Sequence, residues 1–185
     1  GYDDRLYILG SFARRVTFYS QQVRALSLVD ALCDGGRVTR RGEVAVIGAG
    51  VAGMTAAAGL LRRGARVCIF EKDADPAKKE GRMPLQQGSG QRVVHPHIYD
   101  WPAPDALEPQ TKNVLLNWKS DTAKKVVLQM EEEFEKILVE EDNKKRLRFV
   151  EAKDVAIERG TAAVVAGGVR QAFDVVILAV GFGVE

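Results

Sequence analysis

The chain has 185 residues, of which 46% are hydrophobic, enough apolar material for one ordinary core. Its 27 basic and 25 acidic residues leave a net charge of +2, which gives no reason to expect nucleic-acid or membrane partners. Its two cysteines, Cys33 and Cys68, lie far apart in the sequence. This excludes a disulfide framework and favours a reducing, cytoplasmic setting.

The first predicted element in chain order is a helix over residues 12–33, where apolar residues recur at helical spacing. Asp34-Gly35-Gly36 ends this helix, because glycine readily adopts the left-handed conformation found at helix C-termini. Three elements follow: a buried strand at 43–47, a helix at 51–63 and a second strand at 66–70. Such a strand–helix–strand unit is expected to have parallel strands and a right-handed crossover.

The regular pattern is lost over residues 73–119, which contain all six prolines. Long loops of this kind are often functional. A helix is predicted over 120–141, and five short strand-like runs follow it: 147–150, 154–158, 161–166, 169–173 and 174–180. Arg159-Gly160 and Gly167-Gly168 fit tight turns between strands. The last run is apolar throughout, which is typical of a strand buried on both faces of a parallel sheet.

The motif that carries the chemistry is Gly48-Ala49-Gly50-Val51-Ala52-Gly53, placed between the predicted strand and helix. In this context Gly48 permits a tight turn and Gly50 lets a pyrophosphate approach the backbone. Gly53 lets the helix pack closely on the strands. The free N–H groups and the positive end of the helix then face the phosphates. The alternative is a glycine-rich turn in an unrelated α/β protein. Such a turn does not require a strand directly before the three glycines and a helix directly after them, as this sequence has.

Glu71 ends the second strand, at the distance from the glycines where dinucleotide-binding proteins carry an acidic residue. A carboxylate there accepts hydrogen bonds from both hydroxyls of an adenosine ribose. It also repels a 2′-phosphate, which argues against NADP. The spacing alone leaves both FAD and NAD open as the cofactor.

Two stretches, VAVIGAGVAGMTAAAGLLRRGARVCIFEK at 44–72 and FDVVILAVGFG at 173–183, resemble the superfamily of FAD-dependent oxidoreductases. Glutathione-reductase-like enzymes, flavin monooxygenases and amine oxidases belong to it. In that superfamily a helix and a β-meander precede the second stretch, and residues 120–173 are predicted to form the same elements in the same order. The meander favours FAD over NAD.

The resemblance implies an α/β fold with a Rossmann-type FAD/NAD(P)-binding parallel sheet, an inserted β-meander and an extra N-terminal helix. We therefore expect residues 1–42 to form an N-terminal helical extension. Residues 43–185 are expected to form the FAD-binding domain, with 73–119 as its loop region. The superfamily's later Gly-Asp motif has no counterpart in the sequence, and we expect the chain to be an incomplete part of a larger enzyme.

The resemblance also assigns roles to individual residues. Those expected to hold the pyrophosphate are Gly48, Gly50, Val51, Ala52 and Gly53. Those expected around the rest of the cofactor are Glu71 at the ribose, Lys72 beside adenine, Arg82 near the phosphates or ribose, Val155 at adenine through its backbone, and Ala179 and Gly181 in close approach. Val180 stands where the superfamily usually has threonine. The absence of a Cys-x₄-Cys pair argues against disulfide-reductase chemistry.

His95 and His97 are the only histidines and flank Pro96. In an extended segment their side chains point to the same side. They are the candidates for catalytic groups facing the flavin or substrate, with a merely structural loop pinned by Pro96 as the alternative. Two ligands without a third are too few to predict a metal site.

These observations predict an FAD-dependent oxidoreductase that oxidises a small-molecule substrate by hydride transfer to the flavin. An NAD-dependent dehydrogenase and a non-catalytic dinucleotide-binding or regulatory protein are the alternatives, because a fold does not by itself prove activity.

Overall fold

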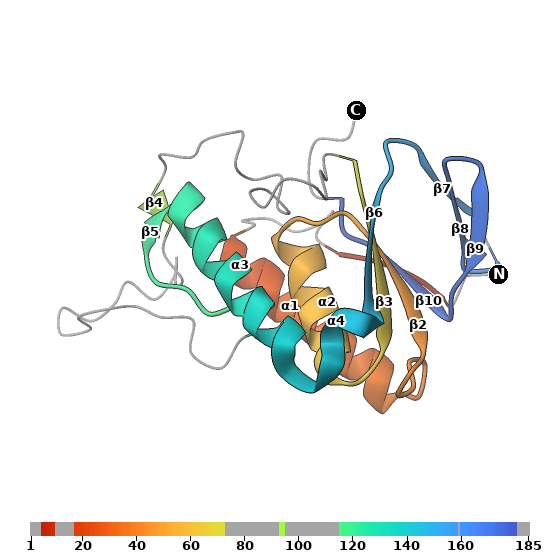
Figure 1. Cartoon of the computed structure of the whole chain (residues 1–185), viewed down its shortest axis with the longest axis horizontal. Coiled ribbons are helices and arrows are strands. Elements are labelled where there is room, and N and C mark those ends of the chain that lie inside the picture. Colours follow the sequence, from red (N-terminus) through yellow and green to blue (C-terminus); the bar gives the residue numbers. More distant parts are fainter. Residues whose placement is uncertain (1–4, 10–16, 73–92, 95–114, 159, 181–185) are drawn as a thin grey trace.

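The computed structural model describes residues 5–9, 17–72, 93–94, 115–158 and 160–180 (Figure 1). Its main sheet has five strands in the order β1-β10-β2-β3-β6, and all neighbouring strands are parallel. The strands are, in sheet order, Leu6–Ile8, Val175–Leu178, Glu43–Ile47, Arg66–Glu71 and Leu147–Glu151. The predicted α/β fold with a Rossmann-type parallel sheet is confirmed.

Helices cover one face of this sheet (Figure 1). They are α1 at Phe18–Asp34, α2 at Val51–Arg62 and α3 at Ala123–Val139, followed by a 3₁₀ turn at Glu140–Asp142 and the short α4 at Asn143–Arg146. A capping box starts α1: the Thr17 hydroxyl accepts the Ser20 N–H at 3.0 Å, and the Ser20 hydroxyl accepts the Thr17 N–H at 2.9 Å. The predicted helix therefore begins at Phe18, and residues 10–16 lie outside the described residues.

The other face of the sheet carries an antiparallel meander of β7 at Val155–Glu158, β8 at Ala163–Ala166 and β9 at Val169–Ala172 (Figure 1). Gly167 and Gly168 have φ of +55° and +78° and form the predicted two-residue turn between β8 and β9. The first of the predicted short strands, β6, pairs with β3 in the main sheet instead of joining the meander.

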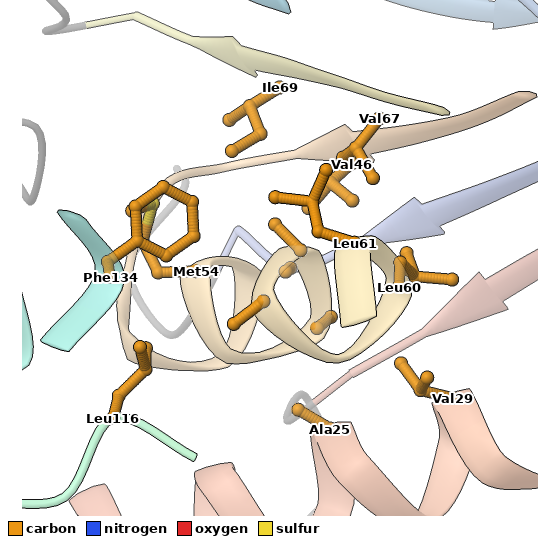
Figure 2. Close-up of a cluster of buried hydrophobic side chains, with 14 of the residues drawn as sticks. Ala25, Val29, Val46, Met54, Leu60, Leu61, Val67, Ile69, Leu116 and Phe134 are labelled. Atoms are coloured by element: carbon orange, nitrogen blue, oxygen red, sulfur yellow. The ribbon is translucent and has the colours of Figure 1, made fainter. Parts of the chain in front are cut away.

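Because both faces are covered, alternate residues of the inner strands enter two separate cores. In β2, Val44 and Val46 pack on the helix side, whereas Ala45 and Ile47 pack on the meander side. This explains why β2, β3 and β10 read as continuous apolar runs. Figure 2 shows the helix-side core, where Val46, Val67 and Ile69 of the sheet, Met54, Leu60 and Leu61 of α2, Ala25 and Val29 of α1, Leu116 and Phe134 come together.

Helix α1 packs closely on α2, since a Cβ on Gly59 of α2 would lie 3.3 Å from both Leu26 and Val29. The extra N-terminal helix thus packs beside α2, and its buried residues share the helix-side core with β2 and β10. Two-residue strands β4 at Val93–Val94 and β5 at Asp121–Thr122 pair antiparallel beside α3. Within the described ranges, no helix combines the length and apolarity that crossing a membrane requires.

Strand β1 was not predicted, and it adds a strand to the N-terminal part of the chain that we expected to be helical. It extends the sheet beyond β10: the Val176 N–H donates to the Arg5 carbonyl and the Leu9 N–H to the Leu178 carbonyl, both at 2.8 Å. The N-terminal residues are therefore part of the same sheet as the glycine motif.

Candidate functional site

The glycine turn, residues 48–53, lies where three parallel strands end. The Gly48 N–H donates to the Phe70 carbonyl of β3, and the Ala179 N–H donates to the Ile47 carbonyl of β2, both at 2.8 Å. From β2 the chain continues to β3 on one side, while β10 lies on the other. The strand order therefore reverses at β2, and open α/β sheets bind ligands outside the carboxyl ends of the strands at such a switch point.

Two of the three motif glycines are required by the packing of the chain itself. Gly48 has φ of +100°, a conformation that favours glycine, and a Cβ there would lie 2.6 Å from the Ala179 carbonyl oxygen. A Cβ on Gly53 would lie 1.9 Å from the Gly48 carbonyl oxygen. Segment 179–180 after β10, the turn and the first turn of α2 thus approach one another too closely for a side chain at either glycine.

Gly50 is different, because the described packing does not require glycine there. Its φ of −69° and ψ of −176° are open to any residue, and a Cβ on it would meet no described atom within 4 Å. Gly50 is the N-cap of α2, with no side-chain cap and no acidic residue in the first helical turn. The first N–H groups of a helix lack intrahelical acceptors and attract anions, so this cradle fits a phosphate group.

Glu71 is held against the glycine turn. Glu71 is only 5% exposed, and its carboxylate accepts the Ala49 N–H at 2.7 Å. Its main-chain carbonyl accepts the N–H of Ala152, in the segment after β6, at 3.0 Å. The structure thus brings Glu71 and the glycine motif together, as an acidic residue at the ribose requires. Lys72 follows as an exposed turn residue.

Of the remaining predicted residues, the structure describes some and not others. Ala179 is buried beside Gly48, and Val180 is 43% exposed with its Cα next to the turn. Val155 begins β7, is half-buried and packs against the meander-side core, so its contact with adenine stays a prediction. Outside the described residues lie Arg82, His95, His97 and Gly181.

Sequence reasoning missed two features of this site. One is the hydrogen bond from the Ala49 N–H to the Glu71 carboxylate. Its donor is a main-chain group, so no residue type in the sequence indicates it. The other is β1, whose carboxyl end reaches the same edge of the sheet through Leu9. Its only signal is the short apolar run Leu6-Tyr7-Ile8-Leu9 before Gly10.

Neither a metal centre nor a reactive thiol is evident in the part of the chain that the structure describes. No group of three or more His, Cys, Asp or Glu side chains gathers there. Cys68 is 2% exposed, and burial raises the pKa of its thiol, which therefore stays protonated and weakly nucleophilic at neutral pH.

Comparison with protein families matches residues 43–141, more than half of the chain, to the family described as FAD dependent oxidoreductase. The matched segment runs from β2 through the glycine turn, Glu71 and α3 into the 3₁₀ turn that follows α3. No curated protein matches the sequence.

Proposed function

Because the chain belongs to the family of FAD dependent oxidoreductases, we propose that it binds FAD over the glycine turn and oxidises a small-molecule substrate by hydride transfer to the flavin. FAD is the cofactor of this family. The substrate class, the hydride transfer and the residue assignments are the parts of this proposal that experiments must test.

The residues around the turn support specific roles in binding. The N-terminal N–H groups of α2 and the positive end of its dipole hold the pyrophosphate. The Glu71 carboxylate accepts the ribose hydroxyls, and its position at the turn is set by the Ala49 N–H. Bound FAD supplies the redox chemistry, while these residues bind and orient its ADP half.

The observation that carries the proposal is the open space at Gly50. Gly48 and Gly53 are explained by contacts within the chain, whereas the absence of a side chain at Gly50 is explained by a ligand that approaches its backbone. The same observation gives the sharpest test, since a side chain at Gly50 fills the ligand's space without displacing any described atom.

We therefore expect the purified protein to show flavin absorbance or to gain it when titrated with FAD. Gly50→Val should abolish FAD binding while the protein remains folded, as judged by circular dichroism. Ala172→Val is the matched control, because it adds a branched side chain at an exposed position of β9 and should retain FAD. Normal flavin content in Gly50→Val would overturn the assignment of the turn.

His95 and His97 remain the candidates for groups that face the flavin or substrate. If His97 acts as a general acid or base, His97→Gln should lower turnover while flavin content is unchanged, and the same test with His95→Gln applies to His95. A cytoplasmic location is part of the proposal, supported by two free cysteines, Cys33 and Cys68.

A further inference from the structure

A cavity of about 340 Å³ lies at the edge of the sheet opposite to the glycine turn. It is formed by the amino ends of β2, β3 and β6, by α4 and by residues of β9 and the segment after it. Arg66 starts β3 and Glu71 ends it, so the length of the strand, about 17 Å, separates the cavity from the glycine turn. The volume lies in the range of about 300–1,000 Å³ that is usual for small-molecule sites.

The rim of this cavity is basic: Arg66, Lys145, Arg146 and Arg148 line it, and Glu43 is the one acidic residue among its lining residues. The sheet geometry explains why the charges gather. Arg148 is the Cα partner of Cys68, whose side chain lies on the meander face. Residues opposite each other, or two apart on one strand, share a face, which places Arg66 on this side as well.

The neighbours of Arg66, Lys145 and Arg148 leave much of the positive charge of these three residues available. Glu43 contacts Arg66 at 3.4 Å, and Asp142 contacts Lys145 at 2.9 Å, but these pairs are solvent-exposed and weak. Arg148 lies beside the Cys68 thiol, whose pKa is raised by burial, so a neutral group faces that guanidinium.

The floor of the cavity is apolar. Phe173, only 6% exposed, and Cys68, 2% exposed, contribute to its lining from the meander-side core. The Phe173 ring is fixed by an edge-to-face contact with Phe70, with ring centroids 6.0 Å apart. An apolar floor under a cationic rim selects a ligand that combines a flat apolar body with an anionic group.

We propose that this cavity binds a small aromatic phosphate monoester, with the phosphate held by Arg66 and Arg148 and the ring against the Phe173 side. Guanidinium groups donate paired hydrogen bonds to phosphate oxygens, and a dianion benefits most from several nearby cations. This site is separate from the dinucleotide site and does not depend on the proposed redox function.

Phenyl phosphate is the probe, measured by calorimetric titration of the full chain, with inorganic phosphate and phenol in parallel titrations. Phenyl phosphate should bind more tightly than either, and its affinity should fall as salt rises. Arg148→Gln should weaken binding by about tenfold or more, the loss typical of a hydrogen bond to a charged group. Arg24→Gln is the matched control at an exposed position of α1 and should change affinity less than twofold.

The glycine turn is itself an anion site, and the two are distinguished by Gly50→Val, which should leave phenyl phosphate affinity unchanged. Loss of binding in Gly50→Val with normal binding in Arg148→Gln would place the probe at the turn and overturn the proposal. Equal affinity for phenyl phosphate and inorganic phosphate would overturn the aromatic part of the ligand class. Absence of phenyl phosphate binding to the folded wild type would overturn the site altogether.

Discussion

The main-chain N–H of Ala49 donates a 2.7 Å hydrogen bond to the carboxylate of Glu71, which joins the glycine turn after β2 to the last residue of β3. This contact sets the carboxylate beside the N-terminus of α2. It also means that Glu71 has two tasks, since it supports the turn and is expected to accept the ribose hydroxyls.

Glu71→Gln should weaken FAD or ADP binding by about 1.5–3 kcal/mol, because it keeps an acceptor but removes the charge that strengthens the hydrogen bonds. Isothermal titration of the cofactor-free protein measures the change. Glu151→Gln is the control, since Glu151 is the Cα partner of Glu71 on β6 and is exposed. Equal dinucleotide affinity of wild type and Glu71→Gln would mean that Glu71 does not hold the ribose.

Alanine at Gly50 and at Gly53 should have opposite effects on the cofactor-free protein. Gly53→Ala forces a Cβ into the Gly48 carbonyl and should lower the free energy of unfolding by about 1–3 kcal/mol or more. Gly50→Ala meets no described atom at allowed backbone angles, and should leave stability unchanged or raise it by up to about 1 kcal/mol. Urea denaturation compares the two, and a larger stability loss in Gly50→Ala would contradict this explanation of the turn.

Gln22 forms a buried polar link between α1 and residues 115–118. Its amide donates to the carbonyls of Leu115 and Leu116 at 2.9 and 3.0 Å and accepts the Trp118 indole N–H at 2.8 Å. Gln22→Leu leaves these buried groups without their partner and should lower the free energy of unfolding by about 2–4 kcal/mol. Trp118→Phe removes only one of the three hydrogen bonds, although it also reduces packing.

Thermal and urea unfolding of both variants, with Arg24→Gln as a surface control on the same helix, measure this effect. A Gln22→Leu protein as stable as the wild type would show that the three hydrogen bonds do not hold residues 115–118 to α1.

Glu158 and Arg170 form a pair across the meander, with the Arg170 Nε–H donating to the carboxylate at 2.9 Å. This hydrogen bond holds the pKa of Glu158 below its ordinary value. A lowered folded-state pKa means that the contribution to stability is present above the ordinary pKa of glutamate and is lost as pH falls through the folded value. Arg170→Met should return the Glu158 pKa toward its ordinary value, as followed by NMR titration, whereas an unchanged pKa would contradict the role of this pair.

The local parts of the fold could be predicted from the sequence, because their causes are local. The turn at Gly48 and Gly53 is predicted by glycines at positions where a side chain does not fit. Helix α2 and strand β3 are predicted by the two apolar segments that follow this turn. Strand β1 has three residues and exists through its pairing with distant β10, so its short apolar run is too weak a local signal to identify it. The placement of β6 beside β3 is likewise decided by long-range packing, since its sequence differs little from the meander strands that follow.

The pairing of β1 with β10 also affects how the protein acquires its structure during synthesis. Leu6 and Val176 are Cα partners in adjacent strands although they lie near opposite ends of the described chain. Strand β10 must insert between β1 and β2, so the edge of β2 stays exposed until the ribosome has released β10. Such long-range closure makes folding slow and leaves apolar strand edges open to self-association in the nascent chain. Chains truncated before β10 should therefore aggregate rather than fold.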